Sequence, residues 1–178
     1  HDAYVVQERL WPHRDLARLS GTDVLQCLRI VTLMGSGRQA SVLYAALRIS
    51  ASDLPIDAFR ARRSSSTGNL VARVGEDGRL AAALRVGQRG VGLVRARTHP
   101  RTGEVIDGAF APGWEGARAL ALRAAAAFPR VRTVGWDVAP TDAGAVLIEG
   151  NAWWGATADP DGALLPVRDD LRAAAKGA

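Results

Sequence analysis

Lysine, cysteine and long apolar runs are scarce in this sequence. Lys176 is the only lysine among 23 basic residues, and Cys27 is the only cysteine in the 178 residues. A single cysteine excludes a disulfide scaffold and any zinc site built on several cysteines. No apolar run approaches the roughly 18 residues that a membrane-spanning helix needs. A starting methionine and a signal-peptide pattern are also missing, so we expect the chain to begin inside a longer protein.

The composition is that of one folded domain or a large part of one. Apolar residues make up 48 % of the chain and charged residues 23 %, which excludes a disordered tail. The net charge is +5, and every basic residue except one is arginine. Arginine forms bidentate pairs with phosphate and carboxylate, which favours an anion-binding protein. The richness in Ala, Gly and Val is typical of a biased genome, so only the position of each arginine separates the two interpretations.

Short β-type runs separated by turn residues dominate the chain. Apolar residues recur at helical spacing from Trp114 to Phe128 and predict a helix that Pro129 ends. A short last helix is predicted over 169–177, and 13–21 is interpreted as a loop or one helical turn. Antiparallel hairpins combined with helices predict an α+β domain. Strands are predicted over 4–10, 24–34, 40–50, 69–74, 79–86, 91–98, 131–139 and 145–151.

The last predicted hairpin carries the most informative residues. If its turn is centred on Ala143, Asp137 lies opposite Glu149, because each is six positions from that centre. Directly opposed residues share a sheet face, and Asn151, two positions further along, points the same way. Two facing carboxylates repel each other, and a divalent cation removes that penalty. Because Mg²⁺ takes hard oxygen ligands, these three residues are a candidate magnesium site; the alternative is an ordinary solvated face.

The same carboxylate pair permits a second interpretation. Opposed Cβ atoms about 4.5–5.5 Å apart allow the carboxyl separation of about 5–5.5 Å that a retaining glycosidase uses. Asn151 has no required part in that chemistry, and the chain shows little of the aromatic cleft expected for sugars. The metal interpretation is therefore favoured.

Two arginines interrupt otherwise apolar strands. Arg29 lies within LRIVTL, and Arg48 lies near the end of the AALRI run. A charge at such a position is costly unless it is paired. Either each arginine points to the solvent side of a half-covered sheet, or both enter a cleft beside the candidate metal site and hold phosphate or carboxylate. The pattern alone slightly favours the solvent side.

Isolated side chains elsewhere carry weaker signals. Cys27 is interpreted as a small core residue, because no His or Asp partner for a nucleophile is evident nearby. His13 and His99 lie in predicted loops, where a lone histidine is ordinarily solvated. Trp153 and Trp154 are expected to pack against the domain.

The ordered segments together resemble a known family. They are VVQERL, LRIVTL, AALRI, the HPRTG loop, GWDVAPTDAG and VLIEGN, and they extend from Tyr4 to about Gly155. The set resembles the ATP-grasp superfamily, above all its sugar-transfer-associated branch, linked to cell-surface polysaccharide biosynthesis, and also the α-L-glutamate ligases. The resemblance implies an antiparallel sheet with flanking helices, a site for ATP and Mg²⁺ on one face, and ATP-dependent joining of a carboxylate to an amine or similar acceptor through an acyl phosphate.

The resemblance also implies roles for individual residues. Asp137, Glu149 and Asn151 match the Mg²⁺ ligands that bridge to the ATP phosphates. Arg29 matches the arginine that holds the phosphate of ATP or of the acyl phosphate, and Arg48 resembles a second anion-binding arginine near the substrate; both are implied to be catalytic. The implied nucleotide-binding residues are Gln7, Glu8 and Leu10 of the hinge segment, His13 near the ribose, and Ile148 against the adenine.

The sequence departs from the family in two respects. The usual Asp-Asn-Phe element reads Asp57-Ala58-Phe59 here, and a serine-rich loop stands in place of Gly-Gly. The single lysine implies that the earlier lobe of the same parent protein, which supplies ATP-binding lysines and a glycine-rich flap, is absent from this chain. We therefore expect 1–155 to be a C-terminal ATP-grasp lobe starting at the hinge and 156–178 to be a tail. The isolated chain is expected to be inactive and to bind ATP weakly.

Two other classes of protein stay open. An arginine-rich nucleic-acid-binding module predicts a basic groove and a steep salt dependence, but the acidic pair Asp137 and Glu149 would repel a phosphate backbone unless a metal intervenes. A degenerate ATP-grasp lobe retained for protein assembly is the other class, which the departure at Ala58 keeps open. The favoured interpretation has no nucleic-acid partner, no membrane span and a cytoplasmic location.

Overall fold

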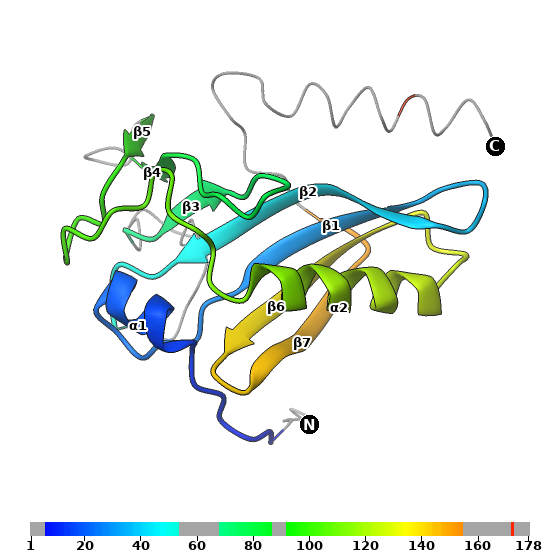
Figure 1. Ribbon diagram of the computed structural model, residues 1–178, viewed down its shortest axis with the longest axis horizontal. Coiled ribbons are helices and arrows are strands. Elements are labelled where there is room, and N and C mark those ends of the chain that lie inside the picture. Colours follow the sequence, from blue (N-terminus) through cyan, green and yellow to red (C-terminus); the bar gives the residue numbers. More distant parts are fainter. Residues whose placement is uncertain (1–5, 54–67, 87–91, 155–171, 173–178) are drawn as a thin grey trace, which may run out of the picture.

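One antiparallel sheet of seven strands forms the body of the protein. The computed structural model describes residues 6–53, 68–86, 92–154 and 172. The strand order is β5-β4-β3-β2-β1-β6-β7 (Figure 1). The α+β class predicted from the sequence is confirmed. The strands are β1 (Leu28–Met34), β2 (Ala40–Ile49), β3 (Leu70–Arg73), β4 (Ala83–Val86), β5 (Leu93–Ala96), β6 (Thr133–Thr141) and β7 (Gly144–Asn151), and the helices are α1 (Arg14–Ser20) and α2 (Trp114–Ala127).

The main hydrophobic core lies between the sheet and the two helices. On β1, Leu28 and Ile30 are fully buried in this core, and Leu16 of α1 joins them. Helix α2 packs on β1, β6 and β7 through small residues, including Ala117 and Ala121 (Figure 1). Because side chains alternate along a strand, the residues between these core positions point to the opposite face, which the helices leave uncovered.

Helix α1 is longer than the sequence indicated. It runs for seven residues where a loop or a single helical turn was expected. The His13 ring caps its first turn, because Nδ1 accepts the N–H of Asp15 at 3.2 Å. Gly21 ends the helix at φ 67° and donates its N–H to Ala17, a conformation that suits glycine. Burial of Leu16 and Leu19 in the main core stabilises this short helix.

Three predicted strands start later than expected or are absent from the described residues; one of them, predicted over 79–86, starts at Ala83. Residues 6–10 form no strand, and Val6 is 95 % exposed. The predicted strand 24–34 starts only at Leu28, because the buried side chain of Gln26 accepts the N–H of Ser50 at 3.2 Å, a position that backbone pairing would otherwise take. The predicted last helix lies outside the described residues, apart from a helical residue 172.

Trp136 of β6 lies in the main core, on the helix-covered side of the sheet, and contacts the two neighbouring strands. Its indole N–H donates to the hydroxyl of Thr32 on β1 at 2.9 Å. Its ring lies so close to Gly150 on β7 that an added Cβ there would stand 2.6 Å from a ring carbon. The side chain thus spans from β1 to β7 beneath β6. Neither helix in the described part of the chain is long and apolar enough to cross a membrane.

Candidate functional site

A β-bulge in the last hairpin brings the two predicted carboxylates face to face. The hairpin closes with Thr141 opposite Gly144, so its turn is centred between residues 142 and 143 rather than on Ala143. A regular register would then put Asp137 opposite Ile148. The pairing shifts between Asp137 and Val138, leaves Ile148 as the extra residue, and sets Asp137 opposite Glu149. The pairing predicted from the sequence is therefore present, although its assumed turn centre is wrong.

Asp137 is buried and is held by two arginines from neighbouring strands. Arg29 stands opposite it across β1 and β6 and binds both carboxylate oxygens, with Nη2 at 2.9 Å from Oδ2. Nη1 of Arg48 on β2 lies 3.7 Å from the same Oδ2. The side chain of Asp137 is 7 % exposed and that of Arg29 11 %. Neither arginine thus simply faces solvent: both approach the predicted metal-binding carboxylate.

This arrangement revises the electrostatic argument made from the sequence. Two opposed carboxylates were expected to need a cation between them. Arg29 and Arg48 supply two positive charges against the negative charges of Asp137 and Glu149, so the four side chains are neutral as a group. A bidentate guanidinium–carboxylate pair also fixes the orientation of Asp137. The carboxylate is consequently preorganised before any ligand arrives.

Glu149 and Asn151 complete the polar part of this face. The amide Nδ2 of Asn151 donates to Oε1 of Glu149 at 3.0 Å and to the carbonyl of Gly135 at 3.5 Å. Glu149 is exposed on the edge strand β7. Among the described residues, no group of three His, Cys, Asp or Glu side chains stands close enough to hold a metal. A metal here would depend on two carboxylates and one amide, a donor set that fits Mg²⁺ when phosphate oxygens complete the coordination.

A small apolar cluster lies on the same face as these polar groups. It consists of buried side chains on β1, β2 and β3, against which Leu43 and the half-buried Trp154 pack; the buried members are Val31, Tyr44, Ala46 and Val71. Trp154 also reaches β6, since a Cβ added at Gly135 would stand 2.6 Å from its Cβ. The packing role expected for Trp154 is confirmed, but that for Trp153, which is 97 % exposed, is wrong.

The residues predicted to bind the nucleotide occupy several parts of the structure. Gln7 and Glu8 are exposed and Leu10 is half-buried, in a segment without helix or strand. The side chain of His13 caps α1, and the backbone N–H of His13 donates to the carbonyl of Pro140, near the end of β6, at 2.9 Å. Ile148, the bulge residue, is 42 % exposed beside Glu149. Only Ile148 therefore adjoins the polar cluster directly; nucleotide contacts of the other four remain predictions.

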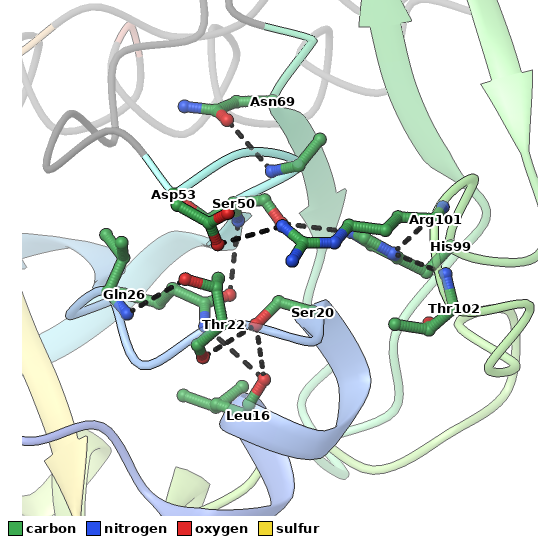
Figure 2. A network of polar contacts seen from close by, with 12 residues as sticks. Leu16, Ser20, Thr22, Gln26, Ser50, Asp53, Asn69, His99, Arg101 and Thr102 are labelled. Atoms are coloured by element: carbon green, nitrogen blue, oxygen red, sulfur yellow. Dashed lines mark hydrogen bonds and ion pairs between the residues drawn. The ribbon is translucent and has the colours of Figure 1, made fainter.

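His99 was expected to be solvated and is instead buried, with 1 % of its surface exposed. Its Nδ1 lies 3.4 Å from the N–H groups of Arg101 and Thr102, so it is an acceptor. Its Nε2 therefore carries the proton and donates to the carbonyl of Ser50 at 2.9 Å (Figure 2). Only a neutral ring satisfies all three groups. The segment from His99 to Gly103 was predicted to be a loop, but nothing in the local sequence indicated that this loop folds onto the end of β2.

The buried ring predicts a loss of stability in mild acid. Burial lowers the pKa of His99 below its ordinary value of 6.5, an effect that nearby Arg101 reinforces and the bond to Ser50 opposes. The unfolded chain therefore binds more protons, and the free energy of unfolding falls as the pH drops below 6.5, by at most about 1.4 kcal/mol per pH unit. Urea denaturation from pH 7.5 to 5.0 measures this slope. The variant His99→Gln should show a shallower slope, and equal slopes would contradict the assignment.

One of three comparisons with known proteins finds a match. A family model described as sugar-transfer associated ATP-grasp matches residues 1–164, nearly the whole chain. No curated protein and no solved structure matches. The match thus covers every strand of the sheet and both helices.

Proposed function

The chain belongs to the sugar-transfer associated ATP-grasp family, and from this membership we propose that it is the ATP- and Mg²⁺-binding part of an ATP-dependent ligase. Its fold is the ATP-binding, ligase-like fold of that family. The proposed reaction joins a carboxylate to an amine or a similar acceptor through an acyl phosphate, in cell-surface polysaccharide biosynthesis in the cytoplasm. One observation carries the proposal: Asp137, Glu149, Asn151 and two arginines meet on the face that the helices leave uncovered.

The proposed chemistry is a phosphoryl transfer followed by an acyl transfer. A carboxylate oxygen of the substrate attacks the γ-phosphorus of ATP, the bond to the β,γ-bridging oxygen breaks, and ADP leaves. The amine nitrogen then attacks the carbonyl carbon of the acyl phosphate, loses a proton, and inorganic phosphate leaves. Catalysis of such transfers depends chiefly on positioning and charge neutralisation.

The side chains of this face have the charges that these steps require. Asp137, Glu149 and Asn151 would hold Mg²⁺, which neutralises charge on the phosphate oxygens when it is bound. Arg29 orients Asp137 through two bonds. Arg48 approaches Asp137 less closely, at 3.7 Å, and is more exposed, at 23 % of its side chain. Of the two, Arg48 is therefore better placed to reach a phosphate or carboxylate of the ligand, and Arg29 to position the metal ligand.

A nucleic-acid-binding role fits the same arginines poorly. Such a module needs arginine side chains directed at a phosphate backbone. Arg29 and Arg48 are directed at a buried carboxylate instead, and exposed Glu149 lies on the same face. The degenerate-lobe alternative depends on Ala58, which lies outside the described residues.

The variant Glu149→Gln tests the proposal. It preserves the shape of the side chain and its contact with Asn151 but removes a charge that Mg²⁺ needs. We expect at least a tenfold weaker affinity for ATP in the presence of Mg²⁺ and little change when EDTA removes the metal. Calorimetric titration with ATP measures both affinities. Glu115→Gln on the exposed side of α2 is the matched control; an unchanged Mg²⁺ dependence in Glu149→Gln would remove the metal assignment.

A further inference from the structure

The pair of Arg29 and Asp137 is buried although it lies on the face that the helices leave uncovered. The Asp137 side chain is 7 % exposed and the Arg29 side chain 11 %. No helix of the described part of the chain covers this face, so other side chains of the face must shield the pair from water. Trp154, in the segment that follows β7, is one side chain whose place beside Arg29 the structure defines.

Trp154 and the stem of Arg29 border the same small space above Gly135. A Cβ added at Gly135 would stand 2.6 Å from Cβ and 3.3 Å from Cγ of Trp154. The same point is 3.3 Å from Cδ of Arg29. Gly135 and Asp137 are two positions apart on β6 and therefore share this face. Trp154 thus lies next to the polar cluster, over the neighbouring pair of residues in the ladder.

The close approach explains why residue 135 is glycine. The φ angle of Gly135 lies outside the left-handed region, so its backbone conformation would accept alanine. The space above it would not, because the nearest atom is the Cβ of Trp154, which cannot swing away from its own backbone. A glycine within a strand often marks such an approach of another part of the chain.

Trp154 is also held from the side away from Arg29. It packs on the small apolar cluster of this face, which includes Val31 of β1 and Tyr44 of β2. An arginine stem that lies along a fixed apolar side chain keeps fewer conformations than one in water. Trp154 is therefore placed to restrict the stem of Arg29, whose guanidinium binds both oxygens of Asp137.

We propose that Trp154 is a positioning residue of the candidate site, and that Gly135 provides the room for it. Packing on the Arg29 stem keeps the guanidinium on both oxygens of Asp137, and exclusion of water strengthens those bonds. Trp154 acts through Arg29 on the orientation of Asp137. The inference rests on the proposed function, in which Asp137 is a Mg²⁺ ligand, and adds a residue behind that ligand.

Hydrogen exchange of the Arg29 side chain tests the proposal without nucleotide or Mg²⁺. Its Nε–H donates to Asp137, so its NMR signal should exchange slowly with water. In Trp154→Ala we expect this exchange to be about tenfold faster relative to the backbone amides of β1, which report opening of the sheet itself. Trp154→Phe keeps a ring above Gly135 and should retain most of the protection.

The preceding tryptophan supplies the matched control. Trp153 is 97 % exposed, so Trp153→Ala should leave the exchange of the Arg29 Nε–H unchanged. Gly135→Ala reaches the same contact by a second route, because it keeps the Trp154 ring but displaces it. This variant should also speed the exchange of the Arg29 Nε–H.

The affinity for ATP with Mg²⁺ measures the consequence for the proposed function. Calorimetric titration should show about tenfold weaker affinity in Trp154→Ala, the loss usual for residues that orient metal ligands. Trp153→Ala should bind as the natural protein does. An unchanged affinity in Trp154→Ala, in a protein whose Mg²⁺ dependence is lost in Glu149→Gln, would overturn the inference.

Three exchange results would overturn it as well: an unchanged Arg29 Nε–H in Trp154→Ala, an acceleration that the β1 amides share equally, or the same acceleration in Trp153→Ala. The proposed function fails separately, through an unchanged Mg²⁺ dependence in Glu149→Gln. Faster exchange in Trp154→Ala alone would then stand as a property of the Arg29 and Asp137 pair without a ligase assignment.

Discussion

Replacing Asp137 with alanine should destabilise the protein by about 3–5 kcal/mol, because Arg29 is left buried without its carboxylate. At about 2–4 °C per kcal/mol for a chain of this length, thermal denaturation should show a drop of roughly 6–20 °C. The variant should also lose Mg²⁺-dependent ATP binding. A surface pair gives the matched comparison: Arg97 binds Asp107 at 2.8 Å, but Arg97 is 82 % exposed. Asp107→Ala should cost less than about 1 kcal/mol.

A double variant separates stability from binding at this pair. Arg29→Met with Asp137→Leu removes both charges and keeps apolar volume, which in buried pairs often restores or exceeds the original stability. We expect most of the melting temperature to return while Mg²⁺-dependent ATP binding stays absent. A double variant as unstable as Asp137→Ala would show that the unpaired charge of Arg29 is not the cause of the loss, since that charge would no longer be present.

Replacing Trp136 with alanine should cost about 3–5 kcal/mol, the usual range for a buried tryptophan. The ring is 4 % exposed, bonds to Thr32 and packs on Gly150. Its loss would leave a cavity under β6 and release β7, the edge strand that carries Glu149 and Asn151. Urea denaturation measures the stability. We expect Mg²⁺-dependent ATP affinity to fall as well, at temperatures where the variant is still folded.

The neighbouring aromatic residue controls for this effect. The ring of Phe128 lies 6.1 Å from that of Trp136 but is 55 % exposed. Phe128→Ala should therefore cost much less, about 1 kcal/mol or below. Equal losses in the two variants would mean that the contact between the rings, rather than the span of Trp136 across the strands, stabilises the sheet.

Local patterns predicted α2 and the existence of the seven strands of the sheet, because those elements carry their own signals, but they did not predict every strand boundary. Each signal lies within one contiguous segment: the alternation in β1 and β2, the small residues of α2, and the turns of the β1–β2 and β6–β7 hairpins. The start of β1 was misjudged because Gln26 bonds Ser50 through its side chain. The burial of His99 was missed for a similar reason, since its partners Ser50 and Thr102 meet only after the sheet has formed.

The sequence predicted that the three polar residues of the last hairpin lie together, but it did not predict the bonds that Asp137 makes with the arginines. Asp137, Glu149 and Asn151 share a face as expected. Their alignment depends on a β-bulge, which no residue type in the hairpin predicts. That both arginines approach Asp137 depends on how β2, β1 and β6 lie side by side. The order of strands in the sheet is a long-range property, and the spacing of residues within one segment does not predict it.

The bulge at Ile148 also bears on how relatives of this hairpin should be aligned. Residues 138–148 separate the two acids here, and one residue of that stretch has no partner on β6. A related hairpin one residue shorter at this point would still oppose its acids, with an unbroken ladder. A search that demands one fixed interval between the aspartate and the glutamate would discard such a relative. Strand pairing, rather than residue count, is the quantity that comparisons of these hairpins should preserve.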